Sequence, residues 1–266
     1  MINSVLKAID VLCLFSPATP RLALTEISRR LGLPKSTVHS LLATLMARGL
    51  VEKMDDDSYA LGPELISLTQ SVRVNVEIRD RAAPLLRELA NKTRESIYLT
   101  ILDGTRCLYI YAVETHHRLL ARSAVGEHAP LYCTAVGKAM LAYLPQDQVE
   151  QIIAATEFVQ FTPNTITDSA ALCAELAQIV ERGYATDRSE HEQGVYCVGA
   201  PIFNHRREVV AACSVSGASP GLLEEALDQT AHLVRFTAQE ISRRMGYVPA
   251  SPAMVVPTPA DNDLST

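Results

Sequence analysis

The sequence lacks any long apolar run, and none of its hydrophobic stretches approaches the roughly 20 residues that a membrane-spanning helix needs. The first residues, MINSVLKAIDVLCLF, include Asp10 and show no small-residue cleavage site, so they do not fit a secretory leader. These two absences predict a cytoplasmic protein that has no membrane partner.

The sequence also has few cysteines, and no two of them stand in CxxC or metal-finger spacing. Scattered cysteines in a chain of 266 residues favour reduced thiols over a disulfide framework. We therefore expect no metal site and no bound cofactor. The six cysteines are Cys13, Cys107, Cys133, Cys173, Cys197 and Cys213.

The composition is that of a folded protein, but the charge is unevenly distributed. A hydrophobic content of 48% with 20% charged residues excludes disordered and collagen-like classes. The net charge of −6 argues against nucleic acid, yet residues 1–53 hold seven Lys/Arg against three Asp/Glu, a net of +4 that leaves −10 for the remainder. Because phosphate attraction acts locally through screened charges, this pattern fits a DNA-binding module joined to a domain that does not bind DNA.

Residues 1–62 have the pattern of a winged helix-turn-helix domain. Apolar spacing predicts a first helix over residues 4–15, a short second helix that stops at Gly32, and a third that runs from Lys35 or Ser36 to Gly49. The segments LVEK and YALG, on either side of the acidic tip MDDDS, predict two short strands around a turn.

The third helix is expected to bury a leucine-rich side and to offer its polar start to the major groove of DNA. The hydroxyls of Ser36 and Thr37 can donate to phosphate, and the positive end of the helix dipole attracts the same anion. The alternatives are that Ser36 is only an N-cap and that His39 is a solvated surface residue. The candidate DNA-binding residues are Thr25, Lys35, Ser36, Thr37, His39, Ser40 and Thr44.

Residues 63–93 predict a helical linker, although the stretch VRVNVEI inside it alternates with period two, as a strand does. After residue 247 the tail 248–266 is rich in proline and is expected to be disordered.

Residues 94–247 predict an α+β domain with an antiparallel sheet. The stretch SIYLTILDGTRCLYIYAVE predicts a hairpin that turns at Asp103 and Gly104. Further expected strands are RLLARSAV, VYCVGAPIFN and EVVAACSVSG. The expected helices are AVGKAMLAYL, QDQVEQIIAAT, residues 169–182 and a closing helix over residues 222–245.

One candidate binding feature is the stretch CTAVGKAML. Thr134 can cap a helix there, and the unpaired amides that follow can bind an anion such as a carboxylate. The alternative is that Gly137 only permits close packing and that Lys138 is solvated.

A second candidate feature is the strand CSVSG, in which Ser214 and Ser216 stand two residues apart and therefore face the same side. With Cys197 on a neighbouring strand, the two hydroxyls can line a pocket. Equally, they can be hydrogen-bonded core serines.

These motifs stand in an order that resembles the IclR family of bacterial transcriptional regulators. The matching blocks are LTEISRRLGLPKSTVHSLLATLMARGLVEK, YALGPEL, PLYCTAVGKAMLAYLP, TPNTITDSAALCAELAQIVERGYATDRSEHEQGVYCVGAPIFN and VVAACSVSG, which extend to about Gly246. The resemblance implies a winged helix that binds palindromic operator DNA, a helical linker used in dimerisation, a GAF-like domain that binds a small effector, and a homodimer or homotetramer. After STV the family usually has one residue and then an arginine, whereas this chain has Ser40, so the operator preference is expected to differ.

The resemblance also implies where the effector binds. The family forms its site from the start of the glycine-lysine helix, an acid after GYA, the cysteine of GVxC and two serines. In this chain the corresponding residues are Ala135, Val136, Asp187, Cys197, Ser214 and Ser216. A small organic carboxylate is the expected effector, and the candidate apolar walls around it are Tyr132, Cys133, Leu120 and Leu131.

Two rival functions remain in view. Cys197, His191 and Asp187 are suggestive of a thiol nucleophile with a base, although residues this close in sequence need not converge. A metal- or redox-responsive regulator can use the same residues or the pair His116 and His117, but adjacent residues of a strand point to opposite faces. We predict no enzyme, but a ligand-responsive, DNA-binding regulator of a catabolic pathway.

Overall fold

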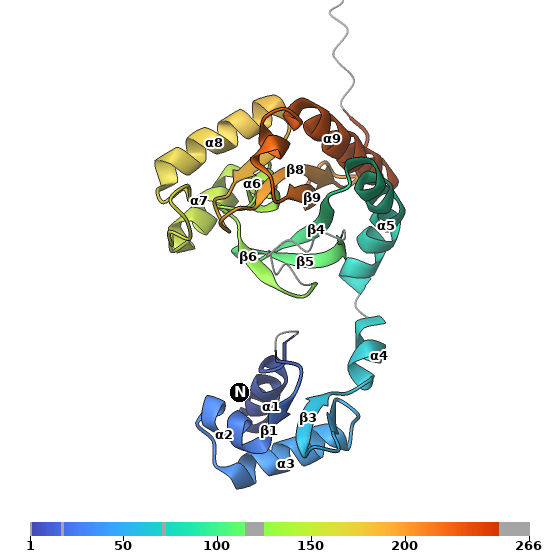
Figure 1. Cartoon of the computed structure of the whole chain (residues 1–266), viewed down its shortest axis with the longest axis vertical. Helices are drawn as coiled ribbons and strands as arrows, with labels where there is room; N and C mark the ends of the chain where they lie inside the picture. The colour runs from blue at the N-terminus through green and yellow to red at the C-terminus, as the bar shows by residue number, and fades with distance from the viewer. Residues whose placement is uncertain (1, 17–18, 71–72, 115–124, 250–266) are drawn as a thin grey trace, which may run out of the picture. The chain divides into compact units, whose positions relative to one another are not determined.

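The computed structural model describes residues 2–16, 19–70, 73–114 and 125–249, apart from the side chains of residues 69–76 (Figure 1). The described residues divide into a smaller unit, which comprises the chain up to Asp80 together with Val125 and Gly126, and a larger unit, which comprises the rest. None of the helices in these ranges is long and apolar enough to cross a membrane.

The smaller unit is a winged helix-turn-helix, as predicted. Its elements are α1 (Asn3–Cys13), β1 (Leu22–Ala23), α2 (Leu24–Leu31), α3 (Lys35–Met46), β2 (Val51–Lys53), β3 (Ser58–Leu61) and α4 (Glu64–Gln70). The two predicted strands are present, and the third helix ends at Met46, three residues before Gly49. The strand β1 was not predicted, because it has two residues and exists only through its pairing with β3, where Leu22 faces Tyr59.

The turn between α2 and α3 fixes how α3 is presented. Gly32 ends α2 with a φ of 64°, a conformation that glycine adopts without the steric cost of a side chain. Ser28 Oγ donates a hydrogen bond of 2.6 Å to the carbonyl of Leu33. Behind the turn Ile27, Val38 and other apolar residues form a buried core.

The connecting helix α5 (Arg73–Thr93) includes RVNVEI, the described part of the stretch VRVNVEI, so these residues are helical and not a strand. Ile78, Ala82, Leu86 and Leu89 are all nearly fully buried, at spacings of three and four residues. This helical periodicity outweighs the short alternation before it.

The larger unit is an α+β domain with an antiparallel sheet, as predicted. Six strands lie in the order β6-β5-β4-β9-β8-β7. The strands are β4 (Ser96–Asp103), β5 (Arg106–Val113), β6 (His128–Pro130), β7 (Ala185–Arg188), β8 (Tyr196–Phe203) and β9 (Val209–Gly217). The helices are α6 (Ala135–Leu141), α7 (Gln146–Ala155), α8 (Ser169–Arg182) and α9 (Leu227–Arg244). Figure 1 shows α6, α7 and α8 on one side of the sheet and α5 and α9 on the other.

One further prediction is wrong in its bounds, and two others fall almost wholly outside the described residues. The expected strand RLLARSAV lies outside the described residues except for its last position, and β6 is the strand that pairs with the outer edge of β5. The closing helix starts at Leu227, not at residue 222, because Pro220–Leu223 forms a 3₁₀ turn and Glu224 leaves helical geometry with a ψ of −96°. The expected tail lies outside the described residues from residue 250 on.

Candidate functional site

The helix α3 has the two sides that its sequence predicts. Val38, Leu42 and Leu45 are buried, and Leu41 is half-buried. The predicted DNA-contacting residues lie on the surface: Lys35, Ser36, His39, Ser40 and Thr44 of α3 and Thr25 of α2 are exposed, and Thr37 is half-buried.

Ser36 is not the N-cap of α3, so that alternative is wrong. Pro34 occupies the cap position with a ψ of 142°, and no side chain caps the helix. Val38 is the first residue whose amide reaches back, to the carbonyl of Pro34 at 3.1 Å. The amides of the first turn come before that bond and have no carbonyl partner within the helix. Amides of this kind can bind a phosphate at a helix start.

Two hydroxyls of α3 are turned back onto their own helix. Ser40 Oγ donates to the carbonyl of Ser36 at 3.1 Å, and Thr44 Oγ1 donates to the carbonyl of Ser40 at 2.8 Å. In this arrangement each outward-facing oxygen is an acceptor, whereas phosphates and the guanine edge require donors. Contact with either therefore requires the hydroxyl to exchange its bond within the helix for one to DNA.

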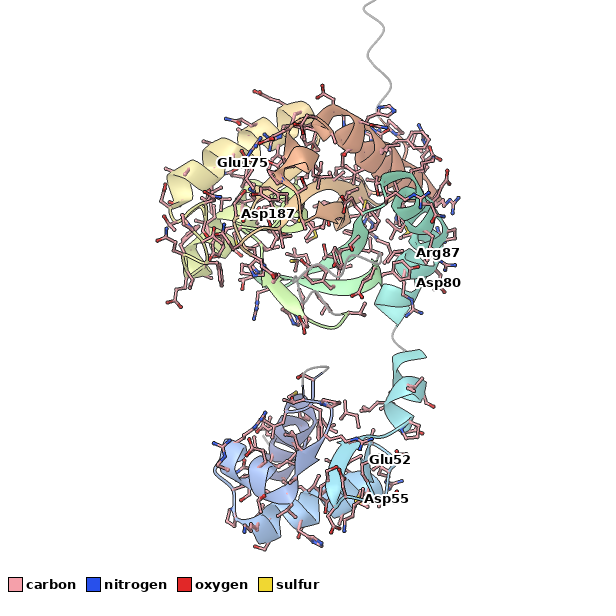
Figure 2. All side chains as sticks on the ribbon, viewed as in Figure 1. Glu52, Asp55, Asp80, Arg87, Glu175 and Asp187 are labelled. Atoms are coloured by element: carbon pink, nitrogen blue, oxygen red, sulfur yellow. The ribbon has the colours of Figure 1, made fainter. Side chains whose placement is uncertain are left out.

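The wing, which comprises β2, β3 and the turn between them, is acidic. Glu52 and Asp55 lie on it (Figure 2). Lys53 Nζ is paired with Asp57 at 2.6 Å, and Arg21 lies 3.9 Å from Asp56. The nearby cations are thus committed to the wing's own carboxylates, which leaves the start of α3 as the better anchor for a phosphate.

In the larger unit four of the six predicted effector residues lie side by side across three strands. Asp187 of β7 pairs with Cys197 of β8, which pairs with Ser216 of β9. Directly paired residues share one face of a sheet, and Ser214, two residues from Ser216, lies on it too. The two serine hydroxyls are 3.5 Å apart and both are buried.

The first turn of α6 rests on this same face. A Cβ atom on Gly199 would come within 2.9 Å of the carbonyl of Ala135 and 3.1 Å of the amide nitrogen of Val136. Gly199 pairs with Ser214, so the close approach at this glycine brings the start of α6 against the polar face. All six predicted effector residues therefore converge on one place, in which Cys197 is half-buried and the other five are buried.

Thr134 caps α6, as predicted. Its Oγ1 accepts from the amide of Gly137 at 3.1 Å, and the first bond within the helix runs from the amide of Lys138 to the carbonyl of Thr134. The amides of Ala135 and Val136 come before that bond and therefore have no carbonyl partner within the helix. A Cβ on Gly137 would lie 2.4 Å from the carbonyl of Leu131, so close packing is also a real requirement there.

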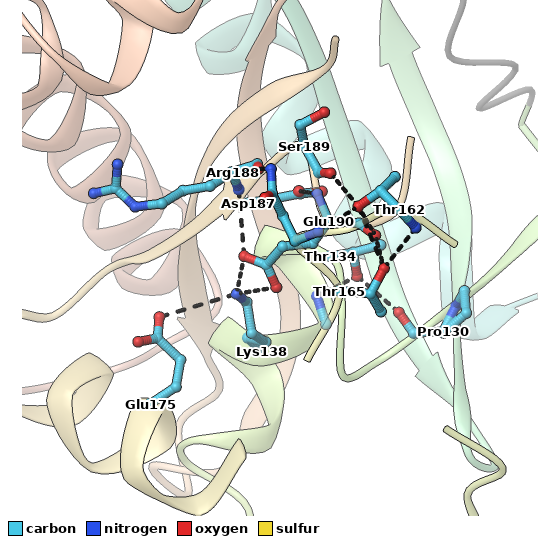
Figure 3. A network of polar contacts seen from close by, with 12 residues as sticks. Pro130, Thr134, Lys138, Thr162, Thr165, Glu175, Asp187, Arg188, Ser189 and Glu190 are labelled. Atoms are coloured by element: carbon cyan, nitrogen blue, oxygen red, sulfur yellow. Dashed lines mark hydrogen bonds and ion pairs between the residues drawn. The ribbon is translucent and has the colours of Figure 1, made fainter. Parts of the chain in front are cut away.

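The alternative that Lys138 is solvated is wrong. Its side chain is 1% exposed, and Nζ contacts both carboxylate oxygens of Glu190, at 2.6 and 2.7 Å (Figure 3). Glu175 of α8 lies 4.0 Å away and is itself paired with Arg182 at 2.5 Å. Glu190 was missed by the sequence analysis, because nothing local shows that residues 52 apart form a buried ion pair.

Hydroxyl groups fasten the turn after β7, which carries Glu190, to the loop after α7. Thr162 Oγ1 donates to the carbonyl of Ser189, and Thr165 Oγ1 to that of Glu190, both at 2.6 Å (Figure 3). Asn164 Nδ2 donates to the carbonyl of Arg188 at 2.9 Å. These bonds hold the turn over the start of α6.

The buried groups titrate unusually. Burial, helped by the charge of Glu190, raises the pKa of Asp187 to about 7. Burial raises the pKa of Cys197 well above its ordinary value, and it raises the pKa of Tyr98 to about 12. Tyr98 pairs with Ser214 across β4 and β9, so it belongs to the polar face and was missed by the sequence analysis.

The geometry offers no support for the rival functions. A thiol with a raised pKa is a poor nucleophile, and the ring of His191 packs on Phe161 with centroids 5.0 Å apart. No group of three or more metal-ligating side chains occurs within the described ranges. His116, His117 and the candidate wall residue Leu120 lie outside those ranges.

The other candidate walls belong to the core on the α6 side of the sheet. Leu131, Tyr132 and Cys133 are each at most 3% exposed. The hydroxyl of Tyr132 donates to the carbonyl of Val159 and accepts from its amide, both at 2.8 Å, so it has no bond to spare for a ligand.

Comparison with known proteins covers almost the whole chain. Residues 4–55 match the IclR helix-turn-helix domain, and residues 70–243 match the bacterial transcriptional regulator IclR C-terminal domain. HTH-type transcriptional regulator XynR of Escherichia coli is 35% identical over 93% of this chain and 98% of its own. HTH-type transcriptional regulator KipR of Bacillus subtilis is 32% identical over 92% and 98%.

Solved structures agree in fold. The IclR structure of Thermotoga maritima has a TM-score of 0.79 at 33% identity and covers 93% of this chain and all of its own. An IclR homologue of Microbacterium hydrocarbonoxydans, complexed with 4-hydroxybenzoate, has a TM-score of 0.84 at 23% identity and covers 91% and 99%. The relatives named here are transcriptional regulators, which confirms the prediction that the chain is not an enzyme. The chain belongs to the IclR family of DNA-binding transcriptional regulators.

Proposed function

We propose that this regulator binds a small organic carboxylate between the start of α6 and the polar face of the sheet, and that this effector controls operator binding for a catabolic pathway. The observation that carries the proposal is the convergence of Ala135, Val136, Asp187, Cys197, Ser214 and Ser216 in one place, where all but the half-buried Cys197 are buried. The amides of α6 and the serine hydroxyls supply donors of the kind that a carboxylate accepts. A protein of the same fold is complexed with 4-hydroxybenzoate, which supports a carboxylate of this size.

On the DNA side, α3 enters the major groove with its first turn toward phosphate and base edges. The contacting residues are Thr25, Lys35, Ser36, Thr37, His39, Ser40 and Thr44. Lys35 is exposed at the positive end of the helix, which supports a phosphate contact there. Ser40 supplies one oxygen where an arginine would supply a bidentate pair of donors, so operator preference departs from that of relatives with arginine.

The working form is a homodimer or homotetramer. Val5, Leu6 and Ile9 on α1 are 52%, 41% and 49% exposed, and apolar side chains at this spacing on one helix support burial against a second copy. The effector changes operator affinity only through its different affinities for the DNA-competent and incompetent oligomers.

Two double variants test this function together. Ser36→Ala with Thr37→Ala should abolish the shift of the native promoter fragment and leave the thermal shift caused by an effector unchanged. Ser214→Ala with Ser216→Ala should keep the promoter shift and lose its response to effector. The effector is first found by a thermal-shift screen of organic acids.

Each double variant controls for the other, because both must keep the wild-type circular dichroism spectrum. If the α3 variant shifts the promoter as wild type does, the DNA-contact assignment fails. Loss of folding in the serine variant would instead support the core-serine interpretation.

A further inference from the structure

The cation that acts on Asp187 and Cys197 of the proposed effector site is Lys138, and it is already committed. Lys138 Nζ holds both oxygens of Glu190 at 2.6 and 2.7 Å, and its side chain is 1% exposed (Figure 3). A bidentate pair of this kind leaves little attraction for an incoming anion. A carboxylate ligand therefore gains its stabilisation from neutral donors and not from a salt bridge.

Asp187 has no such partner for its charge. It is 4% exposed, and its Oδ1 accepts from the amide of Glu190 at 2.7 Å. Its position beside Cys197, in line with Ser216, makes it part of the proposed site. The charged or titratable groups that act on it within the described ranges are Lys138 of α6, Glu190 of the turn after β7, Cys197 of β8 and Cys133 before α6.

The net charge of the cluster formed by Lys138, Glu190 and Asp187 decides how many of its carboxylates are protonated. With Lys138, Glu190 and Asp187 all ionised the net charge is −1, and one proton makes it zero. The proton belongs on Asp187, because Glu190 accepts two bonds from Lys138 and one from the amide of Arg188, whereas backbone amides are the donors to Asp187. Burial and the charge of Glu190 raise the pKa of Asp187 to about 7, in agreement with this placement.

We infer that Asp187 determines specificity in the proposed effector site: a carboxylate binds there only when Asp187 is a neutral acid, so at a pH where the ligand-free site holds Asp187 ionised it takes up one proton with a monocarboxylate, and it rejects dicarboxylates. The inference rests on the proposed function. As a neutral acid Asp187 keeps its bond from the Glu190 amide and donates its own proton to a ligand oxygen. A second carboxylate on the ligand would find neither an uncommitted cation nor a second proton.

The sign of the pH dependence follows. Below the pKa of Asp187 the acid is already neutral, and affinity for a monocarboxylate is constant with pH. Above it, Asp187 must take up a proton from the solvent when a ligand binds, so the affinity falls about tenfold for each pH unit. An uncharged amide analogue of the same shape should show no such fall.

The experiment uses the full chain and four matched pairs of probes: benzoate, 4-hydroxybenzoate, lactate and pyruvate, each against its amide. Phthalate and malate are the dicarboxylate probes. Wild type and Asp187→Asn are measured by calorimetry from about pH 5.5 to about pH 8.5, in phosphate and in Tris, whose different ionisation enthalpies count the protons. Asn keeps the acceptor for the Glu190 amide and a donor for the ligand.

For any acid that binds wild type, we expect a tenfold loss of affinity per pH unit above about pH 7, and a proton uptake that rises from near zero at about pH 5.5 to about one at about pH 8.5. In Asp187→Asn the slope and the uptake should vanish, and affinity at the highest pH should exceed that of wild type. The dicarboxylates should bind more weakly than the monocarboxylates. The proton count in wild type needs no variant, so it decides the matter even if Asp187→Asn does not fold.

A monocarboxylate that binds wild type equally across the range, without proton uptake, overturns the inference and leaves the proposed effector site standing. If no acid and no amide binds at any pH, the proposed site fails and the inference fails with it.

A ligand-free control tests the buried acid separately. The pKa of Asp187 in the folded protein, about 7, exceeds its ordinary 3.8. The stability that this shift provides is complete below the ordinary value and is lost as pH rises through the raised one. As the pH rises between these two pKa values, the melting temperature of wild type should therefore fall relative to that of Asp187→Asn. If the two melting temperatures change in parallel with pH, the inference is overturned.

Discussion

Polar groups in the two units lie in opposite surroundings. On α3 of the smaller unit Ser36, Ser40 and Thr44 are exposed, and two of their hydroxyls are bonded within the helix. In the larger unit Lys138 and Asp187 are almost completely buried. The exposed side chains can be substituted with little change in stability. Each buried side chain is part of the packed core, so its substitution also affects folding. Substitutions that are chemically alike should therefore have different effects in the two units.

The largest expected difference concerns ion pairs. Glu190→Gln leaves the buried Lys138 without its counter-charge, which should cost about 3–5 kcal/mol of unfolding free energy. The matched change is Asp57→Asn, which removes the partner of Lys53 on the exposed wing and should leave the unfolding free energy almost unchanged, because solvent screens this pair. Urea unfolding of both variants measures the contrast.

Equal losses in the two variants would show that Lys138 finds another partner or water when Glu190 is neutralised. Replacing both members of the buried pair by apolar residues sharpens the comparison. Lys138→Met with Glu190→Met should recover much of the lost stability, since removing both charges avoids an unpaired one.

The next contrast concerns glycines. Gly199→Ala would place a methyl group 2.9 Å from backbone atoms of Ala135, which cannot move without shifting α6, and should cost about 1–3 kcal/mol. Gly32→Ala meets no atom within 4 Å and costs only its unfavourable φ of +64°, about 1 kcal/mol. Unfolding midpoints give the stability of both.

The two glycine substitutions should differ even more in their effect on effector binding than in their effect on stability. Gly199→Ala displaces the start of α6 from the polar face and should weaken effector binding, while Gly32→Ala should leave it unchanged. An unaltered effector affinity in Gly199→Ala would mean that the amides of Ala135 and Val136 do not contact the ligand.

Local sequence signals account for much of the fold. Gly32 and Gly183 end α2 and α8 with positive φ, Asp168 and Thr134 cap α8 and α6, and the turn at Gly104 joins β4 to β5. Each of these features is decided within a few residues, which is why composition and spacing predict it.

What the sequence did not predict depends on residues far apart. The two-residue β1 exists only through β3, and Lys138 is buried only because Glu190, 52 residues later, returns to it. Within the proposed effector site, the shared face of Ser214 and Ser216 was predictable from a period of two. The place of Tyr98 beside Ser214 required the order of strands in the sheet.

The smallest expected effects are at Ser40, where the exposed side of α3 can be changed without touching the core. Ser40→Ala removes one exposed bond to the carbonyl of Ser36 and should alter unfolding free energy by no more than about 0.5 kcal/mol. Ser40→Arg adds a cation on the outward face, so its affinity for any DNA should rise and its dependence on salt should steepen by about one phosphate contact.

The salt dependence distinguishes a groove-facing position from one that only lies on the surface. Fluorescence anisotropy with the native promoter fragment and with unrelated DNA, over a series of salt concentrations, measures the slope for wild type and Ser40→Arg. An unchanged slope would place residue 40 away from DNA. The same substitution at an exposed position outside the proposed interface, Val180→Arg on α8, is the control that should leave the slope as it is. If both variants steepen it alike, the added charge acts through the whole chain and not through α3.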